Sequence, residues 1–126
     1  MAQALDSRRF SRVSTGPEYG VRFRSAAGTV ITKAQIQNVS AGGCGLQVSM
    51  GDAVDLETGA NLEALYLDHP WLPYVPLEGQ IVRMLGKVPG KTAGYVLVGV
   101  EFTAITPLVQ SLIQAHVEDR LGEGSP

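Results

Sequence analysis

The chain carries two short polar segments, Arg8-Arg9-Phe10-Ser11-Arg12 and Asn38-Val39-Ser40-Ala41-Gly42-Gly43, on either side of a stretch that reads mostly as β-strand. Arginine binds phosphate through two hydrogen bonds at once and can also reach the Hoogsteen edge of guanine. Asparagine both donates and accepts, serine offers a hydroxyl, and glycine lets a ligand approach the backbone closely. If folding brings the two segments together, they suit an anionic purine nucleotide better than a metal ion or an acyl substrate.

The residues between the two segments alternate between apolar and polar, as expected of half-buried β-strands. Residues 21–24 are predicted as one strand and residues 29–39 as a second, with a turn at Gly28 between them. In the second strand the alternation assigns Val30 to the apolar face and leaves Ile31 as an exception on the polar face. Strands in this place would fold the second polar segment back toward the first.

The rest of the chain continues as short strands separated by turns. Further strands are predicted over residues 44–49, 62–67, 77–85 and 95–102. The connections are predicted to be an acidic surface excursion over residues 50–60, a proline-spaced loop over 69–76 and a hairpin loop over 86–94. Thr106 followed by Pro107 predicts the start of a helix, because threonine caps helix N-termini and proline is tolerated at the first helical position.

This order of elements predicts an all-β fold with a terminal helix, a small antiparallel β-barrel on which the helix packs. At 126 residues the chain is expected to form one domain. Residues 1–19 contain few apolar side chains and are predicted to form a flexible N-terminal arm. Residues 20–121 would form the barrel and helix, and residues 122–126 a disordered tail.

Composition and charge narrow the classes of function. Hydrophobic residues make up 44% of the chain and the net charge is −2, which fits a soluble domain and disfavours binding to polymeric nucleic acid. Five of the ten basic residues nevertheless fall before residue 25, as a small anionic ligand would require. A single cysteine and the lack of a long apolar run predict a cytoplasmic protein that does not insert into a membrane.

Other chemistry finds little support in the sequence. Gly90-Lys91-Thr92 lacks the spacing and the flanking elements of a P-loop, and the acids of residues 50–60 lack the spacing of a calcium loop. His69 and His116 stand alone, with no metal ligand or nucleophile at a recognisable spacing. Cys44 is predicted to be a small core residue. No catalytic group and no cofactor is expected, so the protein is predicted not to be an enzyme.

The proline-rich loop holds the single tryptophan, Trp71, together with Tyr74. The interpretation that we favour is that the tryptophan packs as a lid on the barrel. The other is that it forms an exposed anchor for a partner protein, because such residues dominate interface energetics. The sequence leaves both interpretations open.

The pattern Arg8-x-x-x-Arg12 followed by Asn38-x-Ser40-x-x-Gly43 resembles the two-part signature of the PilZ domain family. Gly99-Val100-Glu101-Phe102 is similar to the family's last strand, and the resemblance covers nearly the whole chain. It implies a six-stranded antiparallel β-barrel and a non-catalytic receptor for the bacterial second messenger cyclic di-GMP. Such a protein would act in second-messenger signalling, in the regulation of motility or biofilm formation.

The same resemblance implies the roles of the site residues. Arg8 and Arg12 would bind the phosphates and guanine edges of the ligand. Asn38, at a position where aspartate is also frequent, would hydrogen-bond a guanine or orient an arginine. Ser40 and Gly43 would shape the turn and supply a hydroxyl and a close backbone approach.

Two further arginines are expected near the ligand. Arg9 adjoins the motif, and Arg83 could stack on a purine from the barrel wall. Ligand binding is predicted to neutralise the arm's guanidiniums and to order the arm against the Asn38–Gly43 turn. The ordered arm and the bound ligand would then present a new face to a protein partner.

Two alternatives remain from the sequence. The first is a structural adaptor of the same fold that binds a protein partner without nucleotide. The second is an unrelated small barrel that binds single-stranded nucleic acid, which the acidic net charge and the scarcity of aromatic residues disfavour. Titration with cyclic di-GMP and with a short oligonucleotide would separate the three.

Overall fold

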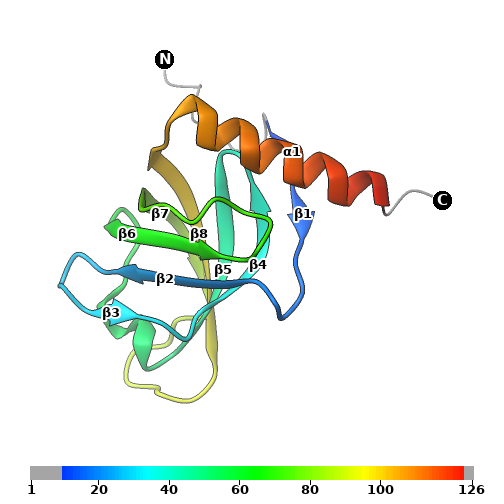
Figure 1. The fold of residues 1–126 in the computed structure, drawn as a ribbon. Helices are drawn as coiled ribbons and strands as arrows, with labels where there is room; N and C mark the ends of the chain where they lie inside the picture. The colour runs from blue at the N-terminus through cyan, green and yellow to red at the C-terminus, as the bar shows by residue number, and fades with distance from the viewer. Residues whose placement is uncertain (1–9, 124–126) are drawn as a thin grey trace.

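A computed structural model describes residues 10–123, in which β-strands form one sheet that closes on itself and a helix lies across one end (Figure 1). The strands are β1 (Val13–Ser14), β2 (Gly20–Arg24), β3 (Val30–Ile31), β4 (Gln35–Ser40), β5 (Gly43–Ser49), β6 (Asn61–Asp68), β7 (Leu77–Leu85) and β8 (Tyr95–Ala104). The helix is α1 (Pro107–Glu123), and one turn of 3₁₀-helix spans Asp52–Asp55.

The strand order β1-β4-β5-β8-β7-β6-β2-β3 becomes a closed barrel because β2 also pairs with β4, through Gly20 and Gln35. All neighbouring strands are antiparallel. The predicted six-stranded antiparallel barrel with a C-terminal helix is therefore confirmed. The two additional strands, β1 and β3, are only two residues long and lie beside β4 and β2.

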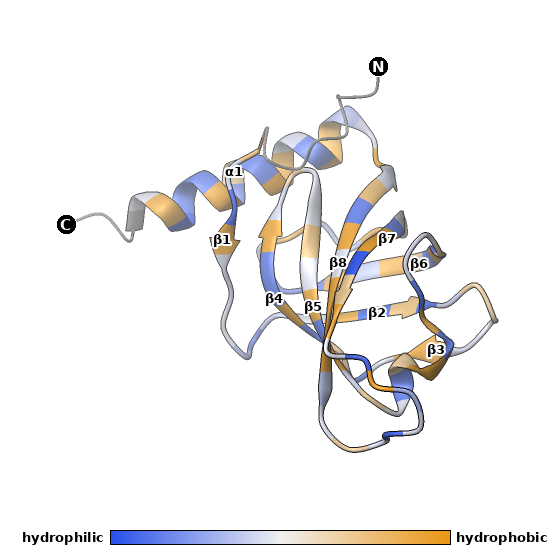
Figure 2. Cartoon of the chain, turned by 180° about the vertical axis from the view of Figure 1, so that it is seen from behind, coloured by the Kyte–Doolittle hydropathy of each residue, from blue (hydrophilic) through white to orange (hydrophobic). Residues whose placement is uncertain are grey.

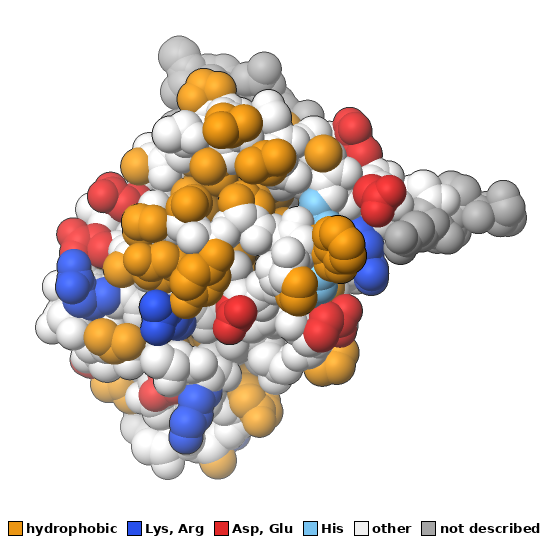
Figure 3. All heavy atoms as spheres, viewed as in Figure 1, with side chains coloured by type: hydrophobic (Ala, Val, Ile, Leu, Met, Phe, Trp, Pro, Cys, Tyr) orange, Lys and Arg blue, Asp and Glu red, His pale blue; other side chains and the backbone are white. Residues whose placement is uncertain are grey.

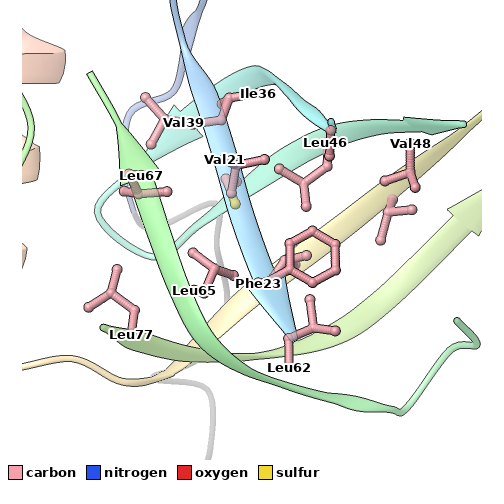
Figure 4. Close-up of a cluster of buried hydrophobic side chains, with 14 of the residues drawn as sticks. Val21, Phe23, Ile36, Val39, Leu46, Val48, Leu62, Leu65, Leu67 and Leu77 are labelled. Atoms are coloured by element: carbon pink, nitrogen blue, oxygen red, sulfur yellow. The ribbon is translucent and has the colours of Figure 1, made fainter. Parts of the chain in front are cut away.

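The interior of the barrel is filled by alternate residues of the long strands. Figure 4 shows labelled side chains from five different strands pointing toward one another, among them Phe23 of β2, Leu46 of β5 and Leu62 of β6. Each of these three is at most 1% exposed. Full burial of one such side chain contributes about 1.5–3 kcal/mol, so this cluster is the main source of the fold's stability.

The sequence prediction for residues 29–39 was wrong in one respect. The expected single strand is broken into β3, which pairs with β2, and β4, which pairs with β5. Ile31 is buried opposite Phe23, whereas Val30 is 63% exposed. Because side chains alternate with a period of two, a break of this kind moves the residues before it to the opposite faces.

Residues 50–60 were predicted to be a surface excursion, and the structure corrects this for their apolar members. Met50, Ala53 and Leu56 are buried and belong to the hydrophobic core. The 3₁₀ turn Asp52–Asp55 places Ala53 inward while Asp55 stays exposed. The acidic residues had suggested solvent, but a short helical turn can bury one side of an otherwise polar segment.

Helix α1 begins as predicted. The Oγ1 atom of Thr106 accepts a hydrogen bond from the N–H of Val109 at 3.3 Å, so Thr106 caps the helix and Pro107 occupies its first position. Ile113 and Val117 are fully buried against the barrel. The predicted disordered tail began at residue 122, but the helix continues to Glu123, and residues 124–126 lie outside the described part of the chain.

The described half of the predicted N-terminal arm, residues 10–19, lies against the barrel. Val13 and Ser14 pair with Val39 and Asn38 of β4, and Tyr19 is fully buried. A flexible arm was predicted from the low apolar content, whereas within residues 10–19 the pairing of Val13 and the burial of Tyr19 place both ends of this segment against the barrel. The barrel contacts thus begin earlier than residue 20.

Within residues 10–123, no helix is long and apolar enough to span a bilayer, and no cluster of three or more His, Cys, Asp or Glu side chains could hold a metal ion.

We expect Gly43→Ala to lower the free energy of unfolding by about 1–3 kcal/mol, because overpacking of this kind strains the backbone. A Cβ atom at Gly43 would lie 2.1 Å from the carbonyl oxygen of Val100, which belongs to the backbone of β8 and cannot rotate away. The measurement is urea denaturation followed by circular dichroism.

Gly51→Ala is the matched control. Gly51 has ordinary right-handed helical angles, with φ −64° and ψ −39°, and no atom lies within 4 Å of the place that an added methyl group would take. This variant is expected to keep the stability of the natural chain or to exceed it slightly. Equal stability of both variants would show that β5 and β8 can separate at no cost.

Candidate functional site

Four cross-strand neighbours form a row on the outer surface of the barrel. Asn38 of β4 pairs with Gly45 of β5, Gly45 with Gly99 of β8, and Gly99 with Arg83 of β7. The strands that carry the first three lie side by side in Figure 2. Because the two central residues have no side chains, the row is low in the middle and raised at its ends. Neighbouring strands are about 4.8 Å apart, so the backbones at Asn38 and Arg83, three strand spacings from each other, lie roughly 14 Å apart across the sheet.

A hollow of about 630 Å³ lies over this row. We call it the glycine-floored hollow. Its lining residues are Arg12, Gln37, Asn38, Cys44, Gly45, Leu46, Val82, Arg83, Leu85, Leu97, Val98, Gly99, Val100 and Glu101. Of these, Arg12, Asn38 and Arg83 were predicted to bind a ligand. The volume falls within the usual range for small-molecule sites.

Arg12 and Asn38 are in direct contact. The guanidinium of Arg12 donates a hydrogen bond to the Oδ1 atom of Asn38. Asn38 also lies across Gly45, since a Cβ atom there would be 2.6 Å from its Nδ2 atom. The two polar segments of the sequence therefore meet at this point, where the pairing of β1 with β4 brings the arm alongside Asn38.

Ser40 and Gly43 have a different position. Ser40 is fully buried, and its hydroxyl accepts a hydrogen bond from the N–H of Gly42 at 3.2 Å and donates one to the carbonyl of Gly43 at 3.3 Å. Neither Ser40 nor Gly43 lines the glycine-floored hollow. The serine hydroxyl holds the β4–β5 turn together, and the turn in turn fixes the strand that carries Asn38.

Two of the predicted site residues, Arg8 and Arg9, lie outside the described residues. Arg83 stands at the far end of the row from Arg12, on β7. A ligand over the two glycines would therefore have an arginine at each side.

Two further polar residues that line the hollow, Gln37 and Glu101, were not predicted from the sequence. The Nε2 atom of Gln37 donates a hydrogen bond to Oε1 of Gln47 at 3.1 Å. Glu101 lies two residues beyond Gly99 on the same face of β8, and a carboxylate there can accept hydrogen bonds from the N–H groups of a guanine. The alternation of apolar and polar residues along the predicted strands places both side chains on the outer surface, and this signal could have identified them.

An apolar rim at the other side of the hollow was likewise not predicted. Val82 and Leu85 of β7 and Leu97 of β8 are each about half exposed and line it. Flat apolar surfaces suit the face of a purine ring, whereas the arginines suit phosphate. The β7 side of the hollow thus combines the guanidinium of Arg83 with apolar surface, whereas the opposite side is formed by Arg12 and Asn38.

Cys44 lies beneath the floor and is fully buried, which confirms the prediction of a small core residue. Burial raises the pKa of its thiol to about 12, although the nearby Arg12 acts to lower it. At neutral pH the thiol is therefore protonated and a poor nucleophile.

A second cluster joins the end of the arm to α1. The Tyr19 ring stacks on His69 with centroids 3.9 Å apart, and its hydroxyl is hydrogen-bonded to Nε2 of His116 at 2.7 Å. The two histidines, which stand alone in the sequence, thus come together through Tyr19. Burial lowers the pKa of His69, while Glu18 acts to raise it.

Trp71 follows His69 in the proline-rich loop. Its backbone N–H donates a hydrogen bond to Nδ1 of His69 at 3.1 Å, but its side chain is 77% exposed. Tyr74 is also exposed, with its ring beside that of Tyr66 at 4.7 Å. The interpretation of Trp71 as a lid on the barrel is therefore wrong.

The barrel and its hollow correspond to a known domain family. A family model described as "PilZ domain" matches residues 6–119. The chain belongs to the PilZ domain family. The signature quoted from the sequence accordingly marks the β4–β5 turn and the arm of a PilZ barrel. Among curated proteins, none matches the chain.

Several solved structures have a similar fold. The complex of MrkH from K. pneumonia with c-di-GMP has a TM-score of 0.74 at 18% identity, over 92% of this chain and 52% of that one. The inhibitor of motility MotI/DgrA from Bacillus subtilis has a TM-score of 0.73 at 17% identity, over 94% and 53%. At these identities the likeness establishes the fold alone.

The PilZ domain of YcgR from Escherichia coli, solved with c-di-GMP, has a TM-score of 0.69 at 18% identity and covers 92% of this chain and 95% of that domain. The present chain spans about half the length of the MrkH proteins that it matches.

We expect Cys44 to react with Ellman's reagent only after unfolding. Burial and a pKa of about 12 leave almost no thiolate in the folded protein at pH 8. The measurement is the release of thionitrobenzoate with and without denaturant. Rapid stoichiometric reaction of the native protein would show that the floor of the hollow opens to solvent.

Proposed function

We propose that this protein is a non-catalytic receptor for cyclic di-GMP that binds the ligand in the glycine-floored hollow. The observation that carries the proposal is the Arg12–Asn38 contact beside the Gly45–Gly99 floor, with Arg83 at the opposite side. This arrangement supplies bidentate donors for phosphate and a flat surface for purine. Two of the similar structures are complexes with c-di-GMP, which supports the choice of ligand.

In this proposal Arg12 binds the phosphates and guanine edges, together with Arg8 and Arg9 from the preceding residues. Asn38 orients Arg12, because its Oδ1 atom already accepts a hydrogen bond from that side chain. Arg83 stacks on a purine from the other side. Ser40 and Gly43 act through the shape of the turn.

The signal is passed on by the arm. Arg12 stands immediately before β1, which is held by only two paired residues, and Tyr19 at the end of the segment packs against His69 and His116. Ligand phosphates would neutralise the arm's guanidiniums and fix residues 10–19, which run from the hollow to the cluster of Tyr19, His69 and His116 (the Tyr19 cluster). Ordering costs about 1–2 kcal/mol per residue fixed, so only part of the arm can be immobilised at micromolar affinity. The ordered arm and ligand together then form a face for a protein partner.

We expect cyclic di-GMP to bind with micromolar or tighter affinity in isothermal titration calorimetry, and Arg12→Ala to weaken binding by about 1.5–3 kcal/mol, since a charged hydrogen-bonding group is lost. Arg24→Ala is the matched control. Arg24 is an exposed arginine of β2 that pairs with Glu63 at 2.7 Å, outside the hollow.

The proposal fails if the natural chain gives no heat at high micromolar ligand, in which case an adaptor without nucleotide becomes the better interpretation. It is wrong in its placement of the ligand if Arg12→Ala and Arg24→Ala bind equally well.

We expect ligand to slow amide hydrogen exchange over residues 10–19, because these residues would be fixed between the hollow and the Tyr19 cluster. Amides in the centre of β6, which pairs with β2 on one side and β7 on the other and does not line the hollow, serve as the internal reference and are expected to exchange slowly in both states. Binding without any change in residues 10–19 would exclude the arm as the relay.

A further inference from the structure

An exposed apolar surface lies on the side of the molecule formed by α1 and the proline-rich loop. We call it the Trp71 face and define it by Trp71, Leu108, Leu112 and Ala115. Trp71 is 77% exposed and Leu108 69% exposed. Figure 3 shows hydrophobic side chains gathered over this side, with histidine, acidic and basic side chains next to them. Exposed patches of this kind on small soluble domains mark interaction sites.

Helix α1 is apolar on two sides, although packing on the barrel needs only one. Ile113 and Val117 face the core and are fully buried. Leu108, Leu112 and Ala115 are spaced by four and three residues, so they form a second stripe along the exposed side. A helix whose only contact is the barrel is expected to carry polar residues there.

The backbone at Trp71 is held in position by hydrogen bonds to His69. The backbone N–H of Trp71 donates a hydrogen bond to Nδ1 of His69, the backbone N–H of Leu72 donates one to the carbonyl of His69 at 3.0 Å, and the Leu72 side chain is buried. His69 is itself stacked on Tyr19. The backbone of the loop at Trp71 is thus fixed, and fixing it on binding costs little further entropy, while the exposed indole projects from it.

A hollow of about 800 Å³ adjoins the protruding tryptophan and is partly lined by it. Leu112 and Ala115 form its apolar side. Its charged residues have both signs, with Glu18 and Asp119 opposed to Arg120. A strongly acidic or strongly basic partner would meet a like charge in this hollow, whereas a surface with the same mixture of charges would not.

We propose that the protein forms a twofold dimer through the Trp71 face. A twofold axis between a protrusion and an adjacent hollow places the Trp71 of each copy in the hollow of the other. The same axis brings the acids of one copy near the Arg120 of its partner copy. The second copy is favoured over another occupant because the protrusion, the hollow and both charges lie on one surface.

The interface is small and its affinity modest. A tryptophan buries on the order of 150–250 Å², and the neighbouring leucines add to this on each copy. The association is therefore expected to depend on concentration, with monomer at low micromolar and dimer at high micromolar protein. It requires no nucleotide, so it stands independently of the proposed receptor function.

Sedimentation velocity and tryptophan fluorescence over this concentration range test the proposal in the absence of nucleotide. Trp71 is the single tryptophan of the chain, so the emission reports on this face alone. We expect the mass to rise toward that of a dimer and the emission maximum to shift to shorter wavelength in parallel.

Trp71→Ala is expected to remain monomeric throughout, and Leu112→Glu likewise. Tyr95→Ala is the matched control, because Tyr95 is 64% exposed but begins β8, at the end of the strand remote from α1. It is expected to dimerise like the natural chain. A natural chain that stays monomeric at high micromolar concentration overturns the proposal, as does a dimer that survives Trp71→Ala.

Discussion

The arrangement of this protein depends on how closely β5 approaches its two neighbours. Gly43 lies against the Val100 carbonyl of β8, and Gly45 lies beneath the Asn38 side chain of β4. A Cβ atom at either place would clash. The same strand turns Cys44 and Leu46 into the core. One strand therefore supplies core residues on one face, while on the other its glycines allow close packing against β8 at Gly43 and form part of the hollow at Gly45.

Tyr19 has a comparable double role for the arm and the helix. It is fully buried, stacks on His69 and is hydrogen-bonded to His116, a residue far away in the sequence. The segment that carries Arg12 thus ends in a contact with both the proline-rich loop and α1. The glycine-floored hollow and the Trp71 face lie on different parts of the surface, and this short segment is a direct covalent link between them.

Local signals in the sequence were sufficient for much of the fold. The bounds of β7, the alternation of β5 and the helix start at Thr106 follow from strand periodicity and capping chemistry. The short strands β1 and β3 carry too few residues for a periodic signal, and the break before β4 reversed the expected faces of Val30 and Ile31. In the site, the arm and turn were visible as motifs. The Gly45–Gly99 floor was not, because cross-strand register depends on long-range pairing and on bulges such as the one between Ile81 and Arg83.

The amide at position 38 has a consequence for the kinetics of capture. Asparagine aligns the guanidinium of Arg12 without neutralising it, whereas a carboxylate in the same place would cancel its charge. The guanidinium of Arg12 therefore keeps its full positive charge beside the hollow. The field of this charge speeds the encounter with an anion and weakens as the Debye length shortens. For the proposed anionic ligand, the rate of arrival is therefore expected to fall as ionic strength rises, while the Arg12–Asn38 hydrogen bond is already formed without it.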